Sequence, residues 1–228
     1  MKLLISNYGG TLKPNIKNLR INLAVIREFM STGNLFCIAT KRPYTSIKRE
    51  ICIYDIPYDY LICNNGSVIL NSCDRVVNAN YIDPEIATSI IKIIESHGFE
   101  ANLYDEYGQA TDINKTIDID TYVKNIFPNK KMEREIMSIS DQLSFYHKLY
   151  HLCLKYKTNK ADAISKLLEL ENINIDKNDI ITVGDSRSDI KMLKDFNGHK
   201  VLHSYPFLYG KGTKTCFEVK TLVKSLMN

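Results

Sequence analysis

The chain has 228 residues, of which 44% are hydrophobic and 25% charged, and its formal net charge is +4. This length suits one large domain or a core with an insertion, and the composition is that of a globular protein with ample apolar residues for a core. The positive charge is spread along the chain without a basic stripe of interleaved aromatic residues, so we expect no nucleic-acid partner.

The cysteines and apolar runs indicate the compartment. Six cysteines form no C-x-x-C pair and are typical of buried free thiols in a reduced protein. The apolar run that follows Met1-Lys2 has only three residues, too few for the core of a secretory signal. No apolar run approaches the roughly 18 residues that a membrane span needs. We therefore expect a cytoplasmic protein with no membrane partner.

The first third of the chain alternates strands and helices. Strands are predicted at residues 3–5, 35–39 and 60–63, and helices at residues 16–30 and 43–50. Gly33 is a natural stop for the first helix, and Pro43 suits the first position of the second. Polar residues gather after each strand. This order predicts a parallel sheet with helices on both faces.

The pattern changes to α+β at about Ser72. A helix is predicted to begin at Asp83-Pro84-Glu85 and to end at Gly98. Further elements are predicted as strands at residues 76–77, 99–104, 110–113 and 143–156, with a polar helix near residues 131–138. No strand in this segment ends in a polar loop of its own. Residues 72–157 are therefore predicted to form an inserted second domain.

The α/β pattern resumes at residue 158. We expect a helix from Lys160 to about Glu171, a strand at 180–183 that ends in Gly184–Asp189, a further helix, a strand near 200–203 and a closing helix from about Val219. Residues 1–71 and 158–228 are together predicted to form the core domain.

Polar residues at several predicted strand ends point to one site. Because the carboxyl ends of parallel strands meet at one edge of a sheet, we expect Asn7, Thr40 and Asp185 to lie close together, with Lys160 beside them. The Gly9-Gly10 loop lets backbone amides approach an anion. Carboxylates such as Asp185 and Asp189 are ligands for a hard cation. This edge is predicted to bind a phosphate and a divalent cation.

These motifs resemble those of the haloacid dehalogenase (HAD) superfamily, specifically its Cof-like type IIB capped phosphatases. The family motifs D-x-D-G-T-L, T-G-R, N-G, a lysine after the cap and G-D-x-x-N-D correspond here to Asn7–Leu12, Thr40-Lys41-Arg42, Asn65-Gly66, Lys160 and Gly184–Asp189, the last followed by Met192-Leu193. The resemblance implies a HAD-like Rossmannoid parallel sheet with an inserted α+β cap, and Mg²⁺-dependent hydrolysis of a small phosphomonoester, often a sugar phosphate.

The resemblance also implies roles for individual positions. The catalytic positions would be Asn7 (nucleophile), Gly9 (acid and base), Thr40 and Lys160. Phosphate or substrate would be bound by Gly10, Thr11, Thr40, Lys41, Arg42, Asn65, Gly66 and Lys160. The metal would be held by Asn7, the backbone carbonyl of Gly9, Asp185 and Asp189.

Two departures from the family pattern affect the expected chemistry. Asn7 and Gly9 stand where the family has the two aspartates of its D-x-D-G-T-L motif. An amide is a very poor nucleophile, and glycine cannot supply general acid–base help, which is worth about 10²- to 10⁴-fold. The site thereby loses two negative charges. We expect weakened Mg²⁺ binding through the amide oxygen of Asn7, and less repulsion of a phosphate.

The sequence thus predicts a HAD hydrolase-like protein that binds Mg²⁺ and a small phosphorylated metabolite but is impaired in hydrolysis. Two alternatives remain open. One is an active Mg²⁺-dependent phosphomonoester phosphatase with a non-standard nucleophile. The other is a regulatory pseudoenzyme that binds a protein partner, although no motif indicates one.

Overall fold

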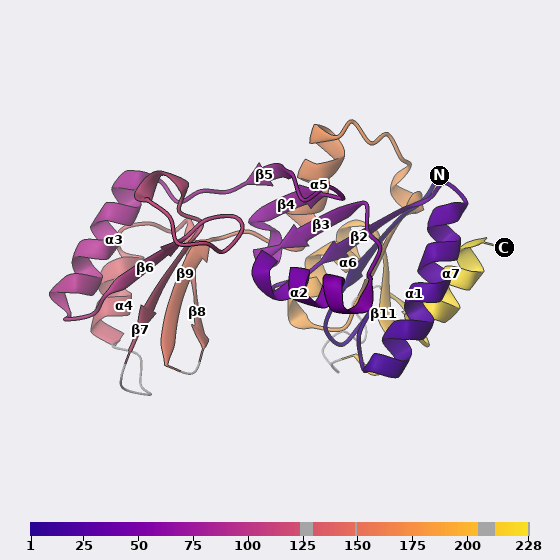
Figure 1. Cartoon of the computed structure of the whole chain (residues 1–228), viewed down its shortest axis with the longest axis horizontal. Helices are drawn as coiled ribbons and strands as arrows, with labels where there is room; N and C mark the ends of the chain where they lie inside the picture. Colours follow the sequence, from indigo (N-terminus) through magenta and orange to yellow (C-terminus); the bar gives the residue numbers. More distant parts are fainter. Residues whose placement is uncertain (124–129, 149, 205–212, 228) are drawn as a thin grey trace. The chain divides into compact units, whose positions relative to one another are not determined.

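The computed structural model describes residues 1–123, 130–148, 150–204 and 213–227 (Figure 1). The chain folds into two compact units, one made of residues 1–78 and 159–228 and the other of residues 79–158.

The first unit is built on an eight-stranded sheet in the order β12-β11-β10-β1-β2-β3-β4-β5. Its parallel strands are β1 (Leu3–Asn7), β2 (Leu35–Ala39), β3 (Tyr60–Cys63), β10 (Ile180–Gly184), β11 (Asn197–Val201) and β12 (Lys214–Cys216). Strand β4 (Val68–Asn71) runs antiparallel to β3, and β5 (Val76–Ala79) forms the edge. All five residues of β1 are buried. This strand lies between β10 and β2, so polar groups from three strand ends converge there.

Helices flank this sheet. They are α1 (Ile16–Ser31), α2 (Tyr44–Tyr54), α5 (Lys160–Leu170), α6 (Ile190–Asp195) and α7 (Val219–Met227). One hydrophobic cluster joins Ile164 and Leu167 of α5, and Leu193 of α6, to Ile5 and Ile62 of the sheet. Helices α1, α2 and α7 lie on the opposite side of the sheet (Figure 1). The predicted fold class, a parallel α/β sheet with helices on both faces, is confirmed.

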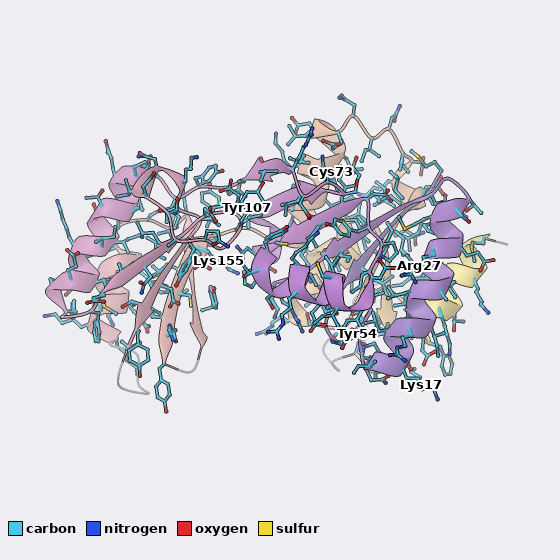
Figure 2. The ribbon with its side chains drawn as sticks, viewed as in Figure 1. Lys17, Arg27, Tyr54, Cys73, Tyr107 and Lys155 are labelled. Carbon is cyan, nitrogen blue, oxygen red and sulfur yellow. The ribbon has the colours of Figure 1, made fainter. Side chains whose placement is uncertain are left out.

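The outward side of α1 carries charged residues. Lys17 and Arg27 are exposed on this helix (Figure 2), and Leu19, Leu23 and Ile26 are buried on its other side. This alternation follows the 3.6-residue period of the sequence.

The second unit is α+β. It contains a four-stranded antiparallel sheet in the order β6 (Ala101–Tyr104), β7 (Asp118–Tyr122), β9 (His151–Tyr156) and β8 (Leu143–Lys148). Helices α3 (Pro84–Ser96) and α4 (Lys130–Met137) pack on this sheet through a cluster that includes Ile90, Ile94, Met132, Ile119 and Leu154.

Strand β5 corrects the predicted start of the insertion. The sequence placed residues 76–77 in the second domain, which was predicted to begin at Ser72, whereas β5 joins the eight-stranded sheet. The reason is a tight turn after β4, in which the Asn71 amide donates to the Arg75 carbonyl (3.0 Å) and Asp74 has a φ of 59°. The first unit therefore continues to Asn78.

Other predicted elements differ in detail, among them the strand expected near residues 200–203, which is β11 at Asn197–Val201. The strand expected at residues 110–113 is a single bridge from Ala110 to Tyr104, after which Asp112 caps a short 3₁₀ turn. Helix α2 begins at Tyr44 with Pro43 as its N-cap, and it runs to Tyr54 rather than ending near Glu50. In the described part of the chain, no helix is both long and apolar enough to cross a membrane.

Candidate active site

The turn after β1 is the centre of the candidate site. It folds back on itself because the Leu12 amide donates to the Asn7 carbonyl (3.1 Å) and the Lys13 amide to the Tyr8 carbonyl (2.9 Å). Gly10 has a φ of +80°, and a Cβ atom there would overlap the carboxylate of Asp185. Glycine therefore lets this loop lie directly against the end of β10.

Lys160 is the buried cation of the site. Its side chain is 1% exposed, and Nζ donates to Oδ1 of Asn7 (2.8 Å) and to Oδ1 of Asp189 (2.6 Å). Burial lowers the pKa of the Lys160 ammonium, which the negative charge of Asp189 opposes and the nearby charge of Lys41 reinforces. Lys160 is thus held between the end of β1 and the loop after β10.

Both carboxylate oxygens of Asp189 are occupied. Oδ1 accepts from Lys160, and Oδ2 accepts from the Asp185 amide (3.1 Å), the Ser186 amide (2.9 Å) and the Ser186 hydroxyl (2.8 Å). Asp189 was predicted as a metal ligand. In this arrangement it anchors Lys160 and closes the turn that carries Asp185.

The carboxamide of Asn7 is fixed in one orientation. Its Nδ2 donates to the Gly9 carbonyl (2.7 Å) and to Oδ1 of Asp185 (2.7 Å), while its Oδ1 accepts from Lys160. A lysine ammonium only donates, and a carbonyl or carboxylate oxygen only accepts, so all three contacts select the same orientation. The sequence predicted that the Asn7 oxygen would face a cation. Here that oxygen faces Lys160.

Asp185 receives a second donor on the same oxygen. The hydroxyl of Thr11 donates to Oδ1 of Asp185 at 2.5 Å. The resemblance assigned Thr11 to phosphate binding, whereas its side chain here bonds the carboxylate of Asp185.

Thr40 lies beside Asn7 because it follows Ala39, the residue of β2 that pairs with Asn7. It is 3% exposed, and its hydroxyl accepts from the Arg42 amide (3.2 Å). The Arg42 side chain bonds Glu50 (3.3 Å). Of the predicted phosphate-binding residues after β2, Arg42 is therefore directed toward Glu50, whereas the charge of Lys41 acts on the Lys160 ammonium.

The backbones of Asn65 and Gly66 contact two neighbouring segments. The Asn65 amide donates to the Thr40 carbonyl (2.9 Å). Gly66 has a φ of +112°, and a Cβ atom there would meet the backbone of Asn159, the N-cap of α5, at 2.5 Å. The N-G turn thus brings the end of β3 against the start of the helix that carries Lys160.

Two contacts of the site were not predicted. The Ser186 hydroxyl caps the turn at Asp189, and the S-x-x-D spacing was a local signal that could have revealed it. The other is His203, whose Nε2 donates to the Gly10 carbonyl (2.7 Å). No local pattern identifies His203, because 193 residues separate it from Gly10.

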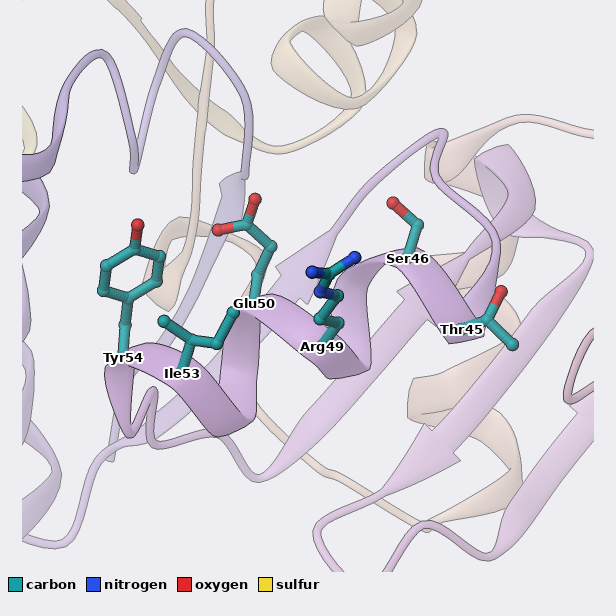
Figure 3. Close-up of a pocket in the computed structure, with 6 residues that line it drawn as sticks. All are labelled: Thr45, Ser46, Arg49, Glu50, Ile53 and Tyr54. Atoms are coloured by element: carbon teal, nitrogen blue, oxygen red, sulfur yellow. The ribbon is translucent and has the colours of Figure 1, made fainter.

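A charged cluster lies behind the Asn7 loop. The Tyr8 hydroxyl (2.9 Å), the Lys13 ammonium (2.5 Å) and the Arg42 guanidinium all donate to Glu50. Burial opposes ionisation of Glu50, but these donors lower its pKa. Glu50 also borders a surface pocket of about 530 Å³ on α2 (Figure 3). The pocket is lined by Thr45, Ser46, Arg49, Glu50, Ile53 and Tyr54.

The residues at the edge do not fit Mg²⁺ in this arrangement. Mg²⁺ requires oxygen ligands at about 2.0–2.1 Å in octahedral geometry and favours carboxylates. Of the predicted donors, the Asn7 oxygen faces Lys160, and Asp189 is fully bonded. The Gly9 carbonyl and Asp185 Oδ1 are both bonded to an amide nitrogen. Within the described ranges, no group of three or more His, Cys, Asp or Glu side chains is arranged to hold a metal ion.

Comparison with known proteins identifies the family. A family model of haloacid dehalogenase-like hydrolases matches residues 4–143 and 109–201. The chain belongs to the haloacid dehalogenase-like hydrolases. An uncharacterized protein of Mycoplasma capricolum is 26% identical to this HAD-family chain, over 90% of this chain and 92% of its own length.

Solved structures share the whole fold. A HAD phosphatase from Bacteroides thetaiotaomicron is 17% identical with a TM-score of 0.74, covering 100% of this chain and 94% of its own. A Thermotoga maritima protein is 16% identical with a TM-score of 0.79, covering 98% of this chain and 97% of its own. A HAD subclass IIB sugar phosphatase is 15% identical with a TM-score of 0.68, covering 100% and 98%.

These comparisons confirm the family and fold predicted from the motifs. The fold is that of subclass IIB and Cof-like HAD proteins, a group that includes sugar phosphatases. Members of this phosphoryl-transfer superfamily generally use Mg²⁺.

Proposed function

We propose that this HAD-family chain binds a small phosphorylated metabolite of sugar-phosphate type and is impaired in hydrolysing it. The observation that carries the proposal is the fixed carboxamide of Asn7, which bonds Lys160 and Asp185 and which the resemblance assigns to the nucleophile position. Thr40, Lys160 and Gly10, which the resemblance assigns to phosphate binding, support the binding part of the proposal.

The impairment follows from the atoms at positions 7 and 9. Attack on phosphorus needs an electron-rich oxygen, and the Asn7 oxygen belongs to a neutral amide that already accepts from Lys160. The nitrogen lone pair is delocalised, and both N–H groups point at oxygens. Gly9 has no side chain to exchange a proton with a leaving group or water, which forfeits a further factor of about 10²–10⁴.

Binding is favoured by the charge balance. Two carboxylates, Asp185 and Asp189, lie beside one buried cation, Lys160, and Asp189 is paired with it. The two aspartates that the resemblance places at positions 7 and 9 would add two negative charges. Without them, a phosphate dianion meets less repulsion beside Thr40, Lys41 and Lys160. We propose the sugar-phosphate class because the fold is shared with a sugar phosphatase. The sequence predicts weakened Mg²⁺ binding because a neutral amide replaces a charged ligand, and the hydrogen-bonded donor oxygens of this site support no bound Mg²⁺ at all.

The first experiment tests catalysis. The double variant Asn7→Asp/Gly9→Asp is assayed with p-nitrophenyl phosphate and a panel of sugar phosphates in Mg²⁺, against wild type and the triple variant that adds Asp185→Asn. We expect turnover in the double variant alone. Robust wild-type turnover that Asp185→Asn abolishes would favour the active phosphatase with a non-standard nucleophile.

The second experiment tests binding. The melting temperature of wild type is measured against inorganic phosphate and sugar phosphates, with sodium sulfate and sodium chloride as ionic controls. Ligand binding to the folded state should raise it with concentration. A melting temperature that does not respond to any phosphate compound would favour a vestigial site in a partner-binding regulator.

A further inference from the structure

The amide nitrogen of Asn7 lies between two oxygens that the family resemblance assigns to a metal. It is 2.7 Å from the Gly9 carbonyl and 2.7 Å from Oδ1 of Asp185. We infer that the Asn7 carboxamide takes the place of the divalent cation, bridging these oxygens so that the site is assembled without a metal and is closed to Mg²⁺.

The Asn7 amide donates a hydrogen bond to the Asp185 carboxylate in a buried environment. Asn7 and Asp185 are 7% and 9% exposed, so little water reaches them. The two amide hydrogens carry partial positive charge toward a carbonyl and a carboxylate, and the latter bond is charge-assisted. Thr11 adds a second donor to the same Asp185 oxygen (2.5 Å). Oδ1 of Asp185 thus accepts two hydrogen bonds, one from the Asn7 amide and one from the Thr11 hydroxyl.

A Mg²⁺ ion at about 2.0–2.1 Å from both oxygens would compete with Nδ2, which already donates to each of them at 2.7 Å. The amide would have to leave, and both of its hydrogen bonds would be lost.

Exchanging the positions of the oxygen and the NH₂ group of the Asn7 amide would not make the site suitable for Mg²⁺. The oxygen would then face the metal, but the NH₂ group would face the Lys160 ammonium, which has no acceptor. The Lys160 side chain is held in place, because it is 1% exposed and its ammonium donates a hydrogen bond to Asp189 at 2.6 Å. The Lys160–Asp189 pair therefore locks Asn7 in the orientation that excludes the cation.

This inference does not depend on the phosphorylated ligand. Mg²⁺ alone is the probe, so the outcome is independent of whether phosphate binds or any substrate turns over.

The test compares wild type with Asn7→Asp. Thermal unfolding and isothermal titration calorimetry are run from 0 to about 10 mM MgCl₂, with ionic strength held constant by NaCl. We expect no Mg²⁺-dependent shift for wild type. For Asn7→Asp we expect a rise of about 5 °C or more at a hundredfold excess of Mg²⁺ over its dissociation constant.

Three further variants make the comparison specific. Asn7→Asp/Asp185→Asn should lose the Mg²⁺ response. Asn22→Asp is the control, because it adds a carboxylate at another buried amide, whose side chain bonds the Leu12 carbonyl and the Lys220 amide. This variant should show no Mg²⁺ response. Asn7→Ala removes the bridge without adding charge and should show a smaller response, which keeps the inference testable if Asn7→Asp does not fold.

Two results would overturn the inference. One is a wild-type Mg²⁺ response that Asp185→Asn removes. The other is the lack of a response in both Asn7→Asp and Asn7→Ala, because the amide would then not be what excludes the cation.

Discussion

Asn7 differs from an aspartate by one NH₂ group, and that group changes what its neighbours can do. A carboxylate would only accept hydrogen bonds, whereas the carboxamide accepts from Lys160 on one side and donates to Gly9 and Asp185 on the other. Compared with the family motif, this difference places an amide at the position that the resemblance assigns to the nucleophile, and it supplies two donors where the resemblance places a cation.

Thr11 should stabilise the fold through the carboxylate that it shares with Asn7. Its hydroxyl bonds Asp185, and a hydrogen bond to a charged group contributes about 1.5–3 kcal/mol. We predict that Thr11→Val lowers the free energy of unfolding by an amount in this range, measured by urea denaturation. Thr182→Val is the matched control, since its buried hydroxyl donates to the neutral Met192 carbonyl (3.1 Å) and should cost only about 0.5–1.5 kcal/mol. An equal or larger loss in the control would contradict this account.

At this scale the sequence predicts which residues meet but not how they bond. The convergence of Asn7, Thr40 and Asp185 follows from strand ends of one parallel sheet. The orientation of the Asn7 amide depends on Lys160, which is 153 residues away in the sequence. No local pattern contains that information.

Among the elements, α5 has the largest influence on the site, because it begins at Lys160. Its N-cap is Asn159, whose side chain accepts from the Asp162 amide (3.1 Å). Its hydrophobic side, including Ile164 and Leu167, is buried on the sheet. The helix start is thus fixed by a cap on one side and by packing on the other.

Removing this cap should affect ligand binding as well as stability. Loss of an Asn N-cap costs about 0.5–2 kcal/mol. We predict that Asn159→Ala loses about that much in urea denaturation and also reduces the rise in melting temperature caused by phosphate. Asn15→Ala removes the equivalent cap of α1, where the side chain accepts from the Asn18 amide (2.8 Å), and should reduce stability alone. Identical phosphate responses in the two variants would show that α5 does not position the site.

The contact between Gly66 and α5 gives a second test of the same element. Gly66→Ala combines a positive φ with a clash against the Asn159 backbone, so we expect a loss above the roughly 1–2 kcal/mol of left-handed strain alone. Gly33→Ala shares the positive φ (+81°) but meets no atom within 4 Å, and it supplies that strain-only reference. Chemical denaturation of both variants gives the difference. Equal losses would mean that the N-G turn has room against α5.

The elements that the sequence missed are short or lack an apolar period. Strand β7 alternates Asp118, Asp120 and Tyr122 with Ile119 and Thr121. It therefore lacks the run of apolar residues that predicts a strand. Strand β12 has three residues, of which only the last is buried. Strand β5 was found but placed in the wrong unit, because its partner depends on the turn after β4.

For the whole molecule, every predicted site residue belongs to the first unit, and the α+β pattern of the second unit predicts no chemistry. The sequence therefore predicts a family and a reaction class but not a particular ligand. The stability of the folded protein, by contrast, depends on a feature that only the structure shows. A buried histidine lies on β11, between β10 and β12 near one edge of the eight-stranded sheet.

His199 should make the fold sensitive to mild acid. It lies on β11, is 9% exposed, and its pKa is lowered to about 4 by burial, with a smaller effect from Lys214. In the unfolded chain a histidine titrates near 6.5. Between these values the unfolded state binds the extra proton, so the free energy of unfolding falls as the pH drops from about 6.5 toward 4.

We predict that His199→Gln and His199→Leu lose less stability than wild type between pH 7 and pH 4.5, measured by urea denaturation at each pH. Neither variant can take up a proton at position 199, so both should show this shallower dependence whatever packing they gain or lose at pH 7. The comparison of slopes separates the titration from the packing, because a polar and an apolar replacement change packing differently but remove the same proton site. A wild-type slope in both variants would mean that other groups govern the acid sensitivity of this fold.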